Sequence, residues 1–136
     1  MDHRILIVDD DESITEFLET FLGQYYNVEC CLDGNEALEK IKGGKFTIIL
    51  SDIAMPEMNG IELLRTVKAY NPFIQIIIMT AFSTIENTIL SLEQGACDFV
   101  LKPFEDIEVV KTVIDATAER LNRWNKVTQA IHQTKS

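Results

Sequence analysis

Residues 5–13, ILIVDDDES, combine a short apolar run with three consecutive aspartates. A run of Ile, Leu and Val without polar alternation is typical of a parallel strand that is buried on both faces. Similar runs recur along the chain, namely VECCL at 28–32, FTIIL at 46–50, FIQIIIM at 73–79 and FVL at 99–101. The sequence therefore predicts a sheet of five parallel strands.

Helical patterns occupy the segments between these runs. Over 14–22, apolar residues repeat at the spacing of one helix face, behind a candidate capping box formed by Ser13 and Glu16. Four more helices are expected at about 33–43, 60–70 and 84–94, and after Pro103. This alternation with short connections predicts an α/β fold with a doubly wound five-stranded parallel sheet, in the flavodoxin-like strand order 2-1-3-4-5.

The composition describes one acidic domain. The chain has 136 residues and a formal net charge of -10, so the body should repel nucleic acid and no direct nucleic acid binding is expected. The most apolar stretch, 73–79, is seven residues long, whereas a membrane span needs about 20. Because the first apolar run is also too short for a signal peptide, we expect a cytoplasmic protein without membrane attachment.

Acidic residues stand where two of the predicted strands end. Strand 1 is followed by Asp9, Asp10 and Asp11, and strand 3 ends in Asp52. Doubly wound sheets bind ligands outside the carboxyl ends of their strands, here between strands 1 and 3. Closely packed carboxylates repel one another unless a cation lies among them. The pattern therefore predicts a hard divalent ion, of which Mg2+ fits best, while Asp11 is expected to be a helix cap.

The ends of strands 4 and 5 indicate what the metal serves. They carry Thr80 and Lys102, which taken singly are an ordinary β-branched strand residue and an exposed strand-end lysine. A metal ion, a carboxylate nucleophile, a lysine and a hydroxyl together are the parts needed for phosphoryl transfer to an aspartate. Asp52 is the expected nucleophile, because Asp9 and Asp10 are placed to hold the ion.

The segments VDDDES, SDIAMPEMNG, MTAF and DFVLKPF, taken together, resemble the receiver domain of two-component response regulators over about residues 1–120. The resemblance implies that Asp52 takes a phosphoryl group from a sensor histidine kinase or phosphotransfer protein. It also implies that Mg2+ lies at Asp9, Asp10, Asp52 and the backbone carbonyl of Ala54. Weak self-phosphorylation and autodephosphorylation are the only activities that it implies.

The same resemblance implies a switch. Lys102 and Thr80 contact the phosphoryl oxygens, Thr80 is drawn inward, and Phe99 occupies the place of the aromatic switch residue that follows it. Plain core packing explains Phe99 equally well. The surface expected to change comprises helix 4, strand 5 and helix 5, and the expected partner is a downstream effector domain or protein. A cis peptide bond is implied between Lys102 and Pro103.

The resemblance also bears on the lifetime of the phosphoryl group. Ala54 and Phe82 occupy the two positions that flank the attacking water in this family. Neither side chain can orient a water by hydrogen bonding, and Phe82 shields the phosphoryl group from water. We therefore expect slow autodephosphorylation.

Other classes of protein fit the chain less well. A flavodoxin-type cofactor domain needs a Ser/Thr-rich or Gly-rich phosphate loop after strand 1, where this chain has aspartates. A haloacid-type phosphatase carries a second Asp two positions after its nucleophile, where this chain has Ala54. Two alternatives stay open: the receiver module of a longer protein, and an interaction adaptor that acts without phosphorylation.

The last part of the chain predicts a long helix. The receiver domain is expected over 1–120, and 121–136 is expected to extend helix 5 as a linker or dimerisation segment. Residues at alternating spacings of three and four form a coiled-coil stripe, namely Ile107, Val110, Ile114, Thr117, Leu121, Trp124, Thr128 and Ile131. Packing on the sheet explains its first half. Its second half is expected to find no surface in this domain, which favours a helix-5 homodimer or docking on a partner over a frayed tail.

Overall fold

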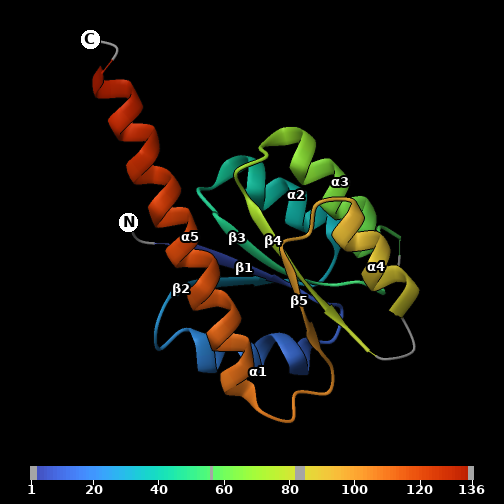
Figure 1. The fold of residues 1–136 in the computed structure, drawn as a ribbon. Coiled ribbons are helices and arrows are strands. Elements are labelled where there is room, and N and C mark those ends of the chain that lie inside the picture. The colour runs from blue at the N-terminus through green and yellow to red at the C-terminus, as the bar shows by residue number, and fades with distance from the viewer. Residues whose placement is uncertain (1–2, 56, 82–84, 135–136) are drawn as a thin grey trace.

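The computed structural model describes residues 3–55, 57–81 and 85–134, and its strands and helices alternate along the chain (Figure 1). The strands are β1 (Arg4–Val8), β2 (Asn27–Cys31), β3 (Ile48–Asp52), β4 (Gln75–Thr80) and β5 (Asp98–Leu101). The helices are α1 (Glu12–Leu22), α2 (Gly34–Gly43), α3 (Gly60–Tyr70), α4 (Ile85–Glu93) and α5 (Ile107–Thr134). One parallel sheet in the order β2-β1-β3-β4-β5 confirms the predicted fold.

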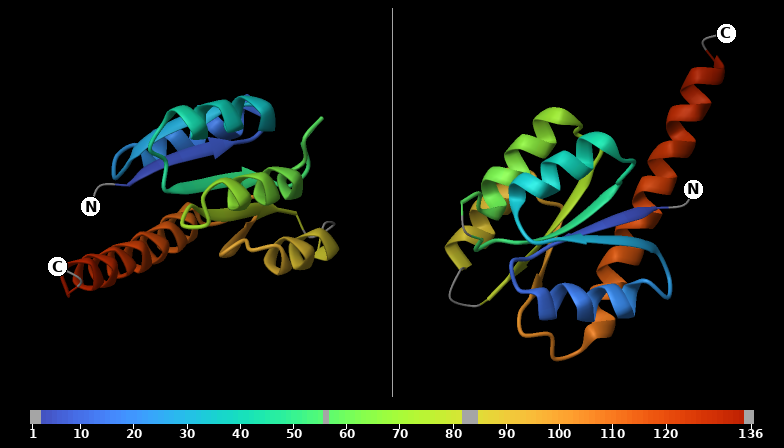
Figure 2. Two further views of the ribbon diagram at one scale, coloured as in Figure 1. Left: turned by 90° about the horizontal axis from the view of Figure 1, so that it is seen from above. Right: turned by 180° about the vertical axis from the view of Figure 1, so that it is seen from behind.

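The central strands are apolar because helices cover both faces of the sheet. Figures 1 and 2 show α1 and α5 on one face and α2, α3 and α4 on the other. Alternate residues of β3 supply the two cores, with Ile49 facing α2 and α3, and Leu50 facing α1 and α5. Full burial of each such side chain contributes roughly 1.5–3 kcal/mol. Every residue of β3 and β4 is buried, so the sheet is held from both sides.

Asp11 sets the start of α1. Its carboxylate accepts hydrogen bonds from the backbone N–H of Ser13 at 3.0 Å and from the Ser13 hydroxyl at 2.6 Å. The expected role of Asp11 as a helix cap is confirmed. The predicted capping box of Ser13 and Glu16 is wrong, because the helix already includes Glu12 and Ser13.

The second half of α5 packs on the domain, contrary to the prediction. Leu121 is buried, and Trp124 packs against the same core cluster as α1. The Trp124 ring meets Phe73, in the loop before β4, edge to face at a centroid distance of 6.5 Å. Further on, Val127 and Ile131 are each 53% exposed, where Figure 2 shows the helix projecting past the body. No helix among the described residues combines the length and apolar character needed to span a bilayer.

Candidate functional site

Three aspartates meet at the carboxyl ends of β1 and β3. Val8 pairs with Ser51 in the sheet, so the next residue of each strand, Asp9 and Asp52, lies at the same edge. One carboxylate oxygen each of Asp9, Asp10 and Asp52 lies within 4.8 Å of the others. Asp9 is fully buried, Asp52 is 8% exposed and Asp10 is exposed. The structure thus brings together the three carboxylates that the sequence placed at one site.

Lys102 reaches this cluster from the end of β5. Its Nζ donates a hydrogen bond to Asp9 Oδ2 at 2.7 Å and lies 3.6 Å from Asp52 Oδ1. Burial disfavours the ammonium charge, but the hydrogen bond to Asp9 and the charge of Asp52 outweigh it, so that the pKa of Lys102 is raised. Lys102 is therefore a stable cation that offsets part of the negative charge.

The pKa of the Asp52 carboxyl group is shifted by its buried and negatively charged surroundings. Its burial, and next the negative charge of Asp9, raise the pKa of Asp52 to about 6, although Lys102 acts in the opposite direction. With three carboxylates and one ammonium, the cluster keeps an excess of negative charge. Its donor set of carboxylate oxygens is the set that hard cations such as Mg2+ prefer, so the residues present fit a magnesium ion.

The loop after β3 leads into α3, which begins directly against the backbone of Asp52. The side chain of Asn59 caps α3 by accepting backbone N–H bonds at 3.0 and 2.9 Å. A Cβ atom at Gly60 would lie 2.4 Å from the carbonyl oxygen of Asp52, so only glycine lets α3 begin this close to the strand. Met55 is buried and Ala54 is exposed; Pro56 lies outside the described residues.

Thr80 ends β4 beside a hollow in the molecule. Its buried hydroxyl donates to the carbonyl of Ala81 at 3.2 Å and accepts a hydrogen bond from the hydroxyl of Thr88 in α4 at 3.0 Å. The hollow, of about 290 Å3, lies between α4 and β5. Phe99, which is 39% exposed, lines it together with both threonines. The core-packing interpretation of Phe99 is therefore wrong.

Thr88 was not identified from the sequence. A threonine inside a helix carries no local signal, because its contact with Thr80 exists only once α4 has docked on the sheet. The peptide bond between Lys102 and Pro103 is cis, as the resemblance implied. Phe82, expected to flank the attacking water, lies outside the described residues.

Comparison with known proteins decides the family. Residues 5–114 match the response regulator receiver domain family. The chain belongs to this family. The receiver domain is 38% identical over 126 residues to the transcriptional regulatory protein ZraR of Klebsiella oxytoca, covering 92% of this chain and 28% of ZraR. It is 41% identical over 114 residues to the regulatory protein VanRB of Enterococcus faecalis, covering 83% of this chain and 51% of VanRB.

The matched part of the receiver domain thus amounts to between about a quarter and a half of the length of these relatives. Among solved structures, it is similar to the crystal structure of a protein named as an adenylate cyclase from Rhodopirellula baltica. The TM-score is 0.90 at 26% identity, over 97% of this chain and 98% of that chain. Coverage this complete means that the similarity includes α5 as well as the sheet.

Proposed function

We propose that this receiver domain is a phosphorylation-driven signalling switch, in which Asp52 accepts a phosphoryl group from the phosphohistidine of a sensor histidine kinase or phosphotransfer protein. The observation that carries the proposal is the placement of Asp52 within 4.8 Å of two further carboxylates and 3.6 Å from the Lys102 ammonium. Membership of the receiver family supports it. The complete set of acidic, cationic and hydroxyl groups favours it over an adaptor that acts without phosphorylation.

Each of these side chains has a proposed role in the transfer. With a pKa of about 6, Asp52 is mostly ionised at neutral pH, so a carboxylate oxygen attacks the phosphorus. The new O–P bond forms as the P–N bond breaks, and the electron pair of that bond stays on the imidazole nitrogen. Lys102 and Thr80 stabilise the charge on the phosphoryl oxygens, and Asp9 orients Lys102 through the 2.7 Å hydrogen bond.

Asp9, Asp10, Asp52 and the backbone carbonyl of Ala54 are the proposed magnesium ligands. The all-oxygen character of this set supports Mg2+. When bound, the ion supplies positive charge beside the phosphoryl oxygens. In its absence, the excess negative charge around Asp52 would repel an incoming phosphoryl donor.

Thr80 and Phe99 are the proposed switch. A phosphoryl group on Asp52 competes with Ala81 and Thr88 for the hydroxyl of Thr80, and the Phe99 ring follows into the hollow between α4 and β5. Exposed apolar side chains gather around this hollow, namely Ile85, Ile89, Leu92, Phe99 and Leu101. Such a patch is suited to protein contact. We therefore assign it to the effector, as a further domain or a separate protein, with the projecting end of α5 as the connecting segment.

Phosphorylation with a small donor tests the proposal. Acetyl phosphate and Mg2+ should add one acid-labile phosphoryl group, seen by intact mass, and Asp52→Asn or removal of Mg2+ should abolish it. Asp11→Asn is the matched control, because Asp11 neighbours the cluster but acts as a helix cap. Labelling that survives Asp52→Asn would contradict the assignment of Asp52.

A further inference from the structure

A second hollow lies at the opposite end of the sheet from the aspartates. Its volume is about 230 Å3, and it lies where α5 passes the amino ends of β3 and β4. Aromatic and aliphatic side chains form most of its wall, namely Phe46, Phe73, Ile74, Leu121 and Trp124. These residues come from the segment before β3, the loop before β4 and the second half of α5. Three separate parts of the chain therefore meet around this aromatic pocket.

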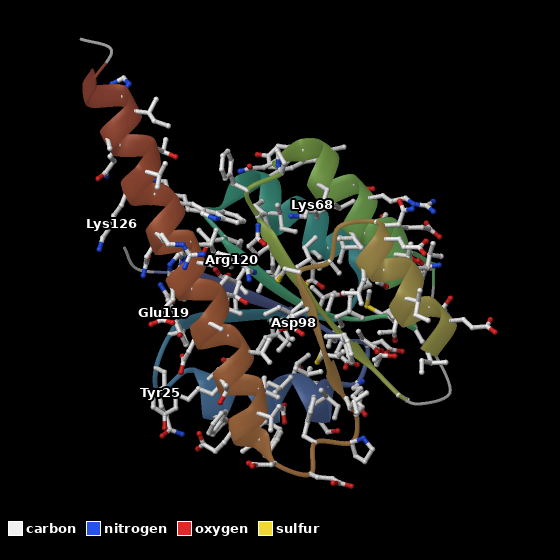
Figure 3. All side chains as sticks on the ribbon, viewed as in Figure 1. Tyr25, Lys68, Asp98, Glu119, Arg120 and Lys126 are labelled. Carbon is white, nitrogen blue, oxygen red and sulfur yellow. The ribbon has the colours of Figure 1, made fainter. Side chains whose placement is uncertain are left out.

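The walls of the aromatic pocket are held in place by their own contacts. The guanidinium of Arg4 lies 4.6 Å from the centre of the Phe46 ring, and that of Arg120 lies 5.7 Å from the Trp124 ring. Figure 3 shows Arg120 on the side of α5 turned toward the sheet, and Glu119 and Lys126 on its outward side. Because the pocket is preformed, a ligand would lose little binding free energy to the ordering of side chains.

The polar side chains that line the aromatic pocket are amides, hydroxyls and one imidazole. His3 is 5% exposed, and its ring nitrogens lie 2.8 Å from Thr47 Oγ1 and 2.9 Å from Asn122 Oδ1. Both nitrogens are therefore already engaged. Asn125 also lines the pocket, and within the described part of the chain its side-chain amide makes no hydrogen bond. Three further polar side chains line the pocket and already make hydrogen bonds, namely Thr47, Asn71 and Thr128. Asn125 is thus the one polar lining side chain without a hydrogen bond in the described part of the chain.

We propose that the aromatic pocket binds a small, neutral, planar aromatic molecule that carries one hydrogen-bonding group. An apolar cavity of about 150 Å3 holds benzene, so 230 Å3 is enough for two fused rings. No carboxylate, lysine or arginine lines the pocket, so a charged ligand would lose its hydration without gaining a counter-charge. Such a ligand contacts α5 and two loops at once, and fixes α5 on the domain far from Asp52.

The single tryptophan of the chain provides a direct test. A protein labelled with nitrogen-15 has one indole N–H signal, from Trp124, and unlabelled indole is a suitable probe. Titration with indole should shift this signal and the backbone amides of Phe73 and Thr128 in a saturable way. The expected Kd is about 0.1–1 mM, as befits so small a ligand. Absence of saturation at the solubility limit of indole would overturn the proposal.

Matched variants locate the binding. Thr128 lines the pocket whereas the next residue, Gln129, does not. Thr128→Phe should weaken binding by about tenfold or more, and Gln129→Phe should leave it unchanged. Phe73→Ala removes a wall without adding bulk, at a side chain that is 62% exposed, and should also weaken binding.

Equal indole affinity in the wild-type protein and the Thr128→Phe and Phe73→Ala variants would contradict the site. Asp52→Asn should bind indole normally, because the pocket lies at the other end of the sheet. This separates failure of the ligand site from failure of the proposed phosphorylation.

Discussion

The ammonium of Lys102 lies 2.7 Å from Asp9 Oδ2 but 3.6 Å from Asp52 Oδ1. The stronger contact of the lysine is therefore with the fully buried carboxylate, and Asp52 receives only part of its charge. Loss of one partner from a buried ion pair is costly, because the other charge stays buried without compensation. Lys102 thus stabilises the fold as well as serving the proposed chemistry.

Lys102→Met should lower the free energy of unfolding by about 2 kcal/mol in metal-free buffer, measured by urea denaturation. Added Mg2+ should restore part of the loss, because it replaces the missing positive charge beside Asp9. Lys45→Met is the control, because Lys45 is exposed and forms no ion pair within the described residues. Equal stability of the two variants would contradict a structural role for the lysine.

Asp52→Asn should stabilise the metal-free protein. The pKa of Asp52 is raised from 3.8 to about 6 in the folded state, so between these values the folded protein binds more protons than the unfolded chain. Stability from this group is therefore present at low pH and is lost as pH rises through about 6. The amide avoids that loss, so we expect a gain of roughly 1–2 kcal/mol at neutral pH.

Urea denaturation of both proteins at about pH 4 and pH 7, without divalent ions, measures this difference. The gain should shrink toward pH 4, where Asp52 is protonated in the wild-type protein. A gain of the same size at both values would show that ionisation of Asp52 is not its cause.

Thr88→Val should make the domain easier to phosphorylate. The hydroxyl of Thr88 donates to Thr80 at 3.0 Å and so holds Thr80 away from its proposed phosphoryl contact. A single hydrogen bond is worth about 0.5–1.5 kcal/mol, which corresponds to an increase of about 2- to 10-fold in the rate of labelling by acetyl phosphate. Thr88→Ser keeps the hydroxyl and should be labelled at the wild-type rate. Slower labelling of Thr88→Val would contradict the claim that the hydrogen bond from Thr88 keeps Thr80 from the phosphoryl group.

The phosphoryl group should be lost slowly, because Ala54 and Phe82 offer no hydrogen bond to the attacking water. The double variant Ala54→Asn with Phe82→Glu should lose it faster, by about tenfold if positioning of the water contributes the usual factor. Decay of the acid-labile label after removal of the donor gives the rate. Unchanged or slower decay in the double variant would count against this account.

The positions of the strand ends could be predicted from the sequence, because neighbouring parallel strands finish at one edge of the sheet. This places Asp9 beside Asp52 regardless of the conformation of the loops. Helix details were less predictable. Asp11 and Ser13 are both good caps, and the local pattern could not choose between them. Phe17 falls on the apolar stripe of α1 yet is 50% exposed, because the buried face of the helix runs through Thr15, Leu18 and Leu22 and leaves Phe17 at its edge. Contacts between distant segments, such as Thr88 with Thr80, leave no local pattern.

The packing of α5 determines how much of its end can be removed without loss of stability. Trp124 meets Phe73, a partner 51 positions earlier in the chain that no helical periodicity reveals. Truncation after Ala118 removes Leu121 and Trp124 from the core cluster, so it should lower the free energy of unfolding by about 4 kcal/mol. Truncation after Lys126 removes the exposed Thr128 from the edge of the aromatic pocket and otherwise only the projecting end, so it should leave stability within about 0.5 kcal/mol of the full chain. Urea denaturation of the two shortened chains tests this contrast.

The same truncation after Lys126 tests self-association. Because Leu121 and Trp124 face their own domain, a helix-5 homodimer would have to use the exposed side chains farther along, of which Val127 and Ile131 are the large apolar ones. We expect the full chain to associate at high micromolar concentration, and both the truncated chain and Ile131→Lys to run as monomers. Sedimentation with and without phosphorylation measures this. If the full chain is also monomeric in both states, the helix-5 homodimer is wrong and the projecting end is left for contact with the effector.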